Sequence, residues 1–84
     1  MAGDLTGRYA QSLAGHDTGS RYIIVRAEGG FAWAADGRLK KAACPKKKNL
    51  KHLRLLPGQL DADRLKDDEI RKAVKRFSKE DVNV

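Results

Sequence analysis

The chain has 84 residues, which is enough for one domain with a small core and leaves little room for a deep catalytic pocket. Its formal net charge of +7 and isoelectric point near 9.9 favour a polyanionic partner, either nucleic acid or an acidic membrane surface. It contains no apolar stretch of the roughly 18 residues that a membrane span needs, no apolar signal-peptide core at residues 1–8, and one cysteine, so we expect a cytoplasmic protein without disulfides.

The first predicted elements are two strands joined by a polar turn. Residues 8–13 give a weak strand signal, and residues 14–20 are a turn region with two glycines. Residues 22–27 are dense in β-branched and aromatic side chains and predict the clearest strand of the chain. Strand alternation places three apolar residues of this segment on one face: Ile23, Val25 and Ala27.

Two more strands are predicted around a second tight turn. The paired glycines Gly29-Gly30 predict a turn, because glycine adopts positive φ without strain. The next strand covers residues 31–35, and Asp36-Gly37 is a strong signal for a two-residue type I′ hairpin. A strand is therefore predicted to follow this hairpin from Arg38 to about Ala43.

The last part of the β region is predicted to be a loop and a short closing strand. Pro45 ends the preceding strand, because proline cannot donate to a ladder. Lys46–Asn49 is predicted to be a mobile charged loop, since three consecutive lysines cannot share one face of a strand. Residues 52–56 predict the closing strand. Short strands with tight turns favour a small, partly closed β-barrel over residues 1–58.

The composition changes at Pro57-Gly58, so residues 59–84 are predicted to be a C-terminal helical appendage. Residues 60–66 can form one or two helical turns, and the main helix begins near Asp67, which is a good N-cap. Four apolar residues recur at helical spacing and form one stripe: Ile70, Ala73, Val74 and Phe77. We expect this stripe to pack on the barrel; docking to a protein partner is the alternative.

Several segments resemble a known family. Gly7-Arg8, the turn Ala14–Gly19 and the hydrophobic strand after it look like a KOW motif, a short β-hairpin element of several ribosomal proteins and transcription elongation factors. Ala35–Arg38 and Lys46–Leu53 resemble a group of short bacterial KOW-domain RNA-binding proteins, which is similar to the KOW-bearing large-subunit ribosomal protein family numbered fourteen. The resemblance covers roughly Thr6 to Leu56 and leaves out the helical tail. It implies an SH3-like β-barrel that binds RNA, possibly on the ribosome.

The basic residues define the candidate site. The segment Arg38–Arg54 contains eight basic residues and no acidic one, whereas the charges of residues 59–84 balance. Mobile ammonium groups suit phosphate contacts, which give salt-dependent and mostly sequence-independent affinity. In KOW proteins the glycine turn often touches RNA. The candidate RNA-binding residues are Arg8, His16, Ser20, Arg21, Arg38, Lys40, Lys41, Lys46, Lys47, Lys48, Lys51 and Arg54.

Other side chains are assigned structural roles. Phe31 and Trp33 are predicted to fill the core and Tyr9 to lie at the surface, and aromatic rings of this kind can also stack on unpaired bases. Cys44 is predicted to be a buried apolar residue. One cysteine and two histidines fall short of a zinc site, and no nucleophile–base pair is evident, so we expect no metal, no cofactor and no enzymatic activity. Four basic residues lie off the apolar stripe and are assigned to a solvated helix face, with a second phosphate-contacting patch as the alternative: Arg71, Lys72, Lys75 and Arg76.

The sequence thus predicts a small SH3-like barrel with a C-terminal helix, monomeric when free, which binds structured RNA and most simply ribosomal RNA. Several alternatives stay open. The lysine loop can serve solubility alone, and a KOW module can bind proteins of the transcription or translation machinery. Binding to duplex DNA or to an anionic membrane also agrees with the charge, although the acidic residues of the tail disfavour the membrane.

Overall fold

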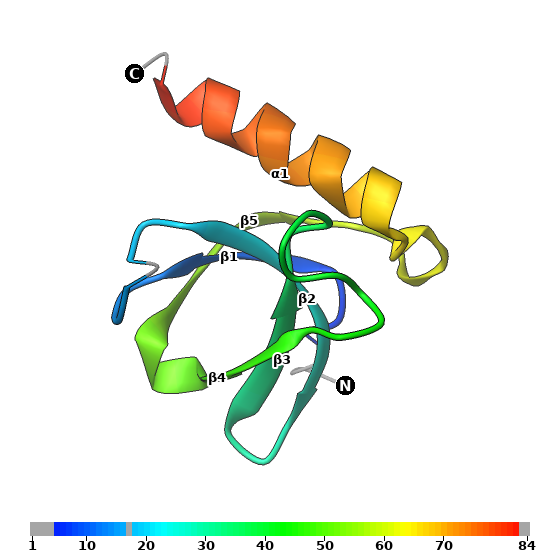
Figure 1. Ribbon diagram of the computed structural model, residues 1–84. Helices are drawn as coiled ribbons and strands as arrows, with labels where there is room; N and C mark the ends of the chain where they lie inside the picture. Colours follow the sequence, from blue (N-terminus) through cyan, green and yellow to red (C-terminus); the bar gives the residue numbers. More distant parts are fainter. Residues whose placement is uncertain (1–4, 17, 83–84) are drawn as a thin grey trace.

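The computed structural model describes residues 5–16 and 18–82, with side chains up to Arg76. The elements in chain order are β1 (Arg8–Ser12), β2 (Arg21–Glu28), β3 (Phe31–Ala35), β4 (Lys46–Asn49), the 3-10 helix η1 (Leu50–His52), β5 (Leu53–Gln59), the 3-10 helix η2 (Ala62–Arg64) and α1 (Asp67–Val82). The chain is mostly β with one C-terminal helix, as the sequence predicted (Figure 1). The predicted strands at 22–27 and 31–35 are confirmed to within one residue at each end.

The five strands form one antiparallel sheet in the order β4-β3-β2-β1-β5. The strands β4 and β5 are its two edges, yet only the three residues of η1 separate them in the chain. The sheet therefore has to curl so that its edges approach each other, and this curl is visible in Figure 1. Among the described strands no hydrogen-bonded ladder joins β4 to β5, so the sheet is open at this seam.

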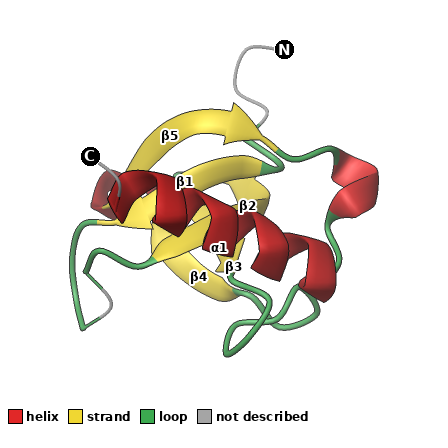
Figure 2. Ribbon diagram, turned by 90° about the horizontal axis from the view of Figure 1, so that it is seen from above, coloured by secondary structure: helices red, strands yellow, loops and turns green. Residues whose placement is uncertain are grey.

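The curled sheet packs an apolar cluster on each of its two sides. The cluster on the inner side takes residues from four strands: Ala10, Ile24, Ala32 and Leu53. The helix α1 covers the other side, where Ile70 and Ala73 pack with Ile23 and Ala35 (Figure 2). Ile70 is fully buried, so part of the predicted apolar stripe lies against the sheet; the side chain of Phe77 lies outside the described part of the chain.

A β-bulge in β2 corrects one predicted face. The register passes from Ile24 opposite Ala34 to Arg26 opposite Trp33, so Val25 is the extra residue. A bulge reverses the alternation of the residues that follow it. Ala27 therefore packs with the cluster of Ile24, on the side opposite Ile23, and the prediction that Ile23, Val25 and Ala27 share one face was wrong.

The predicted lysine loop is a strand. Lys46–Asn49 pairs with β3, with Lys47 opposite Trp33 and Lys48 opposite Ala32. Strand alternation places consecutive lysines on opposite faces of the sheet. A strand tolerates this where the apolar stems of the lysines can pack against a neighbouring apolar surface. Lys47 has such a surface, because its ammonium lies 4.4 Å from the centre of the Phe31 ring. Pro45 precedes this strand and does not end an earlier one.

The strand predicted from Arg38 to Ala43 is a loop, and Asp36-Gly37 is not a type I′ turn. That turn needs positive φ at both residues, and among the described residues only glycines have positive φ. The Asp36 carboxylate accepts hydrogen bonds from the backbone N–H groups of Arg38 and Lys40, both at 2.9 Å. These bonds take two donors away from a sheet ladder, which explains why the strand does not form.

The loop at 36–44 is fastened to the start of α1. The Asp67 carboxylate accepts a hydrogen bond of 2.7 Å from the backbone N–H of Ala42. Asp67 was predicted to be an N-cap, but it is the first helical residue, and the first helical bond runs from Ile70 N–H to the Lys66 carbonyl. For residues 60–66 the sequence predicted one or two helical turns, and the structure has one short 3-10 turn there, η2.

Two predictions of burial were also wrong. Phe31 is 38% exposed and Trp33 is half-buried, because the inner side of β3 holds the fully buried Ala32 and Ala34 instead. A tightly curled sheet has little room on its inner side, so small residues take these places. Cys44 is exposed because it lies in the loop that replaces the predicted strand. Tyr9 is half-buried and packs against the cluster under α1.

The strand β5 runs through the predicted boundary at Pro57-Gly58. It extends to Gln59 because the register with β1 shifts there, from Leu56 opposite Tyr9 to Gln59 opposite Arg8. A bulge tolerates proline and glycine inside a strand. A Cβ at Gly58 would come within 3.4 Å of the Tyr9 ring, so the ring packs against the glycine backbone.

Gly37 gives a direct test of the contact between the loop and the helix. Its φ is +77°, and a Cβ there would lie 2.3 Å from the Asp67 carbonyl oxygen. We expect Gly37→Ala to lower the free energy of unfolding by about 2–5 kcal/mol, through backbone strain and this clash. Gly30→Ala is the matched control, because Gly30 has φ +83° and open space around it; its cost should stay near 1 kcal/mol. Equal losses in urea denaturation would show that the contact is unimportant.

Candidate nucleic-acid interface

The fold brings the lysines of β4 and the turn between β1 and β2 into one groove. The groove has a volume of about 430 Å³. Its lining residues come from the turn, from β4 and from η1: Ala14, Gly15, His16, Lys46, Lys47, Lys48, Asn49 and His52. We call it the lysine groove. Four of the predicted site residues meet here, although they are about 30 positions apart in the sequence: His16, Lys46, Lys47 and Lys48.

A short hydrogen-bond relay holds the turn against β4. The Lys48 ammonium donates to the Ser12 hydroxyl at 3.2 Å, and this hydroxyl donates to the Ala14 carbonyl at 3.0 Å. A hydroxyl can accept and donate at the same time, so the fully buried Ser12 connects the strand to the turn. Lys48 therefore has a structural contact as well as a place in the groove.

The 3-10 helix η1 is held to the same turn. The Leu13 N–H donates to the His52 carbonyl at 2.8 Å. At its other end, the side chain of Asn49 accepts from the Lys51 N–H at 2.9 Å and caps η1. These two bonds fix where η1 begins and ends, so His52 lines the groove beside His16.

The charge of the lysine groove is of one sign. Three lysines line it, and none of its described lining residues is acidic. Lys46 and Lys47 are exposed, and ammonium groups on long flexible stems can reach phosphate oxygens. Their positions are set by the ladder with β3, which leaves only the side chains to be ordered on binding.

Cations cover aromatic rings beside this groove. Arg26 lies 4.3 Å above the ring centre of Trp33, and Lys47 lies 4.4 Å from that of Phe31 and 5.6 Å from that of Trp33. Such pairs are attracted by the ring quadrupole. Arg26 also pairs with Glu28, and its hydrogen bond and charge hold the pKa of the Glu28 carboxyl below its ordinary value.

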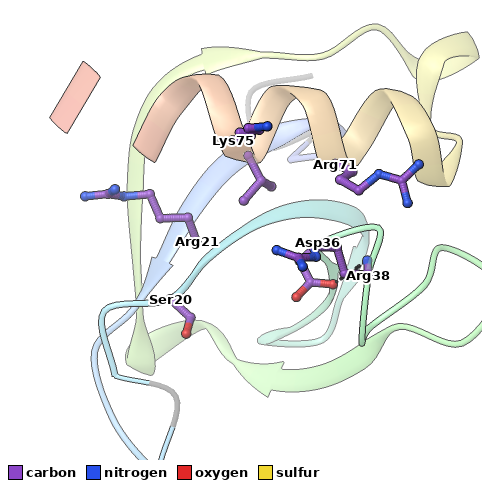
Figure 3. Close-up of a pocket in the computed structure, with 7 residues that line it drawn as sticks. Ser20, Arg21, Asp36, Arg38, Arg71 and Lys75 are labelled. Carbon is purple, nitrogen blue, oxygen red and sulfur yellow. Dashed lines mark hydrogen bonds between the residues drawn. The ribbon is translucent and has the colours of Figure 1, made fainter. Parts of the chain in front are cut away.

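A second groove lies between α1 and the sheet. It has a volume of about 650 Å³, and we call it the helix groove. Its lining residues are Ser20, Arg21, Asp36, Arg38, Arg71, Val74 and Lys75, six of which are labelled in Figure 3. Three of the predicted site residues meet here, namely Ser20, Arg21 and Arg38.

The remaining predicted residues line neither of these grooves. Arg8, at the start of β1, donates to the Leu56 carbonyl at 3.4 Å. Lys40 and Lys41 lie on the loop at 36–44, Lys51 on η1, and Arg54 on β5 opposite Gln11. The structure thus divides the predicted site residues into two grooves and a scattered remainder.

Several lining residues were missed from the sequence. Arg71 and Lys75 were assigned to a solvated face, with a phosphate-contacting patch only as the alternative, and they line the helix groove. Their spacing of four places them on one face of α1, and they flank Val74 of the apolar stripe, which is the signal that could have found them. His52 was considered only as a metal ligand and rejected as one, and its place in the groove depends on η1, which no pattern predicted.

The described residues contain no group of three or more His, Cys, Asp or Glu side chains that could hold a metal ion. No helix within the same residues is long and apolar enough to cross a bilayer.

Comparison of the sequence with protein-family models and with curated proteins gives no match. The resemblance to KOW proteins stays an interpretation of the segments between Thr6 and Leu56. A function has to be inferred from the geometry and charge of the two grooves.

The ion pair beside Trp33 can be tested by titration. Arg26→Met removes the guanidinium that lowers the pKa of Glu28, so this pKa should rise toward the ordinary value of a glutamate carboxyl. Side-chain NMR of Glu28 between pH 2 and 7 measures it. Arg54→Met, which removes a cation from β5, is the control and should leave the Glu28 pKa unchanged. An unchanged value in Arg26→Met would contradict the pairing.

Proposed function

We propose that this protein binds structured RNA, with the lysine groove as the main contact to phosphates. The observation that carries the proposal is the meeting of the glycine-containing turn and the lysine strand in one groove without a described acidic lining residue. Sequence alone offered two basic or flexible segments with no spatial relation. A groove lined by three lysines and two histidines fits a polyanion better than a flat basic surface does.

The chemistry of these groups favours phosphate recognition. Lysine ammonium groups on flexible stems neutralise phosphates without demanding one geometry, so the affinity depends on salt more than on sequence. His16 is exposed at the turn and can donate a hydrogen bond to phosphate or sugar oxygens. Phe31 is exposed beside Lys47, and an unpaired base can stack on its ring.

We further propose an SH3-like barrel of the KOW type and ribosomal RNA as the target. Support comes from the curled five-stranded sheet, from the three-residue connection between its edge strands, and from the segments that resemble KOW proteins. These features agree with one another, because the turn at Ala14–Gly19, which resembles part of a KOW motif, also supplies part of the lysine groove. Asp17 of this turn lies outside the described residues.

The alternative function is a protein-interaction module. Leu39 favours it, because this side chain is 88% exposed on the loop at 36–44. A protein partner that uses this loop would be lost with Leu39→Ser and kept when lysines of β4 are removed. RNA binding predicts the opposite pattern.

Removal of two lysines from the groove tests the proposal. Lys46→Ala with Lys47→Ala keeps the bond between Lys48 and Ser12 and removes two phosphate partners. We expect weaker binding to an RNA hairpin and a slope of log K against log salt that is less negative by about 2, one for each lost contact. Fluorescence anisotropy at several salt concentrations measures both.

The matched control is Lys72→Ala with Arg76→Ala. It removes the same charge from exposed positions of α1 that line neither groove. If the control weakens binding as much as the lysine variant does, net charge and not the groove determines the affinity, and the proposed site is wrong.

Co-sedimentation with ribosomes tests the proposed target. The tagged wild-type protein should travel with the large ribosomal subunit in a gradient of lysate from its own cells at low salt. The Lys46→Ala, Lys47→Ala variant should stay nearer the top, because it has lost two phosphate contacts. A wild-type protein that remains at the top of the gradient would contradict the ribosomal target. Whether the protein binds RNA at all would then be decided by the hairpin measurement.

A further inference from the structure

The helix groove has the charge of a second phosphate-binding site. Among its described lining residues, four are cations, Arg21, Arg38, Arg71 and Lys75, and one is an acid, Asp36. Arginine presents a planar fork of donors that matches phosphate oxygens in pairs, and three of the four cations here are arginines. The sequence offered a phosphate-contacting patch at Arg71 and Lys75 only as the alternative to a solvated helix face.

The four cations reach this groove from three separate elements. Arg21 begins β2, Arg38 lies on the loop at 36–44, and Arg71 and Lys75 lie on α1. In Figure 3 the side chains of Arg21 and Arg71 extend in opposite directions, toward the two ends of the groove. Residues 50 positions apart in the sequence thus contribute cations to the lining of one groove, and such a concentration of positive charge attracts anions.

Asp36 is the one acid among the described lining residues. One oxygen of its carboxylate accepts from the backbone N–H groups of Arg38 and Lys40, at 2.9 Å each. Asp36 thus shapes the loop that presents Arg38, and its single negative charge leaves the described lining with an excess of positive charge. Val74 supplies an apolar surface between Arg71 and Lys75 on the helix.

The walls of the groove are fixed before any ligand arrives. The Gly37 backbone packs against the first turns of α1, and Ala42 is bonded to Asp67. On the other wall, Ile70 and Ala73 hold α1 on the sheet. A ligand therefore has only the long cationic side chains to order, which lowers the entropic cost of binding.

The two grooves lie at either end of the same connection. Ala14, Gly15 and His16, near the start of the segment that joins β1 to β2, line the lysine groove, and Ser20 at its end lines the helix groove with Arg21, the first residue of β2. We infer that the helix groove binds the phosphodiester backbone of the same RNA, which passes from one groove to the other across this connection. This inference rests on the proposed function and assigns to α1 a direct part in it.

The test compares two pairs of substitutions on one helix. Arg71→Ala with Lys75→Ala removes two cations from the groove, and Lys72→Ala with Arg76→Ala removes two exposed cations outside it. Alanine favours helix at all four positions, and circular dichroism checks that α1 is kept. The probe is an RNA hairpin with a stem of about 16 base pairs, the length that a small double-stranded RNA-binding domain covers.

We expect the Arg71→Ala, Lys75→Ala variant to bind about tenfold more weakly and its salt slope to become less negative by about 1–2. The outside pair should change affinity less than about twofold, if only net charge is altered. Arg38→Ala, which leaves the helix untouched, should also weaken binding and lower the slope by about 1.

Other outcomes overturn the inference in different ways. If Arg71→Ala, Lys75→Ala behaves like the outside pair while Lys46→Ala, Lys47→Ala still weakens binding, the helix groove is not an RNA site and the proposed function stands. If wild type does not bind the hairpin but binds polyglutamate in a manner that needs Arg71 and Lys75, the groove takes an acidic protein. If wild type binds neither probe, the proposed function fails as well.

Discussion

Gly37 lies so close to the first turns of α1 that a Cβ on it would stand 2.3 Å from the Asp67 carbonyl oxygen and 2.8 Å from the Arg71 nitrogen. This contact draws the loop at 36–44 under the helix, where the Asp67 carboxylate receives the Ala42 N–H. The loop then has to return to the sheet, and it does so as β4, at the edge beside β3. The loop that lines the helix groove and leads to the lysine strand is thus fastened to α1 at a position where a side chain would clash with the helix backbone.

The proposed interface has a stiff frame and flexible contacts. The backbone around each groove is set by sheet ladders, by the relay through Ser12 and by the bonds of Asp36 and Asp67. The cations themselves stand on long stems, and most of them are exposed. A binding surface of this kind can follow the backbone of RNA without reading bases, because phosphate spacing is similar in every sequence.

The sequence predicted what local patterns determine. Residues 22–27 and 31–35 are apolar and β-branched or aromatic enough to form strands in most contexts, and Ile70, Ala73 and Val74 recur at the spacing of a helix. The composition therefore indicated a mostly β chain with a C-terminal helix. These are the elements whose preference does not depend on a distant partner.

The errors came from contacts between residues far apart in the sequence. The lysines of β4 have no strand pattern of their own, and they pair because β3 offers a ladder and aromatic rings. The segment 36–44 was predicted to be a hairpin turn followed by a strand, but the Asp36 and Asp67 carboxylates accept hydrogen bonds from its backbone N–H groups. The place of Arg71 and Lys75 in a groove with Arg21 depends on how α1 lies across the sheet, which no local pattern contains.

The edges of the sheet have a consequence for the protein at high concentration. An edge strand offers unpaired backbone groups on which a second copy can add, and such pairing leads to aggregation. Here one edge carries three consecutive lysines, so two copies of β4 placed side by side would repel each other. The other edge, β5, contains Pro57, which has no N–H to donate. The lysines proposed to attract RNA would therefore also oppose edge-to-edge pairing of two copies, and a bound polyanion would weaken that repulsion.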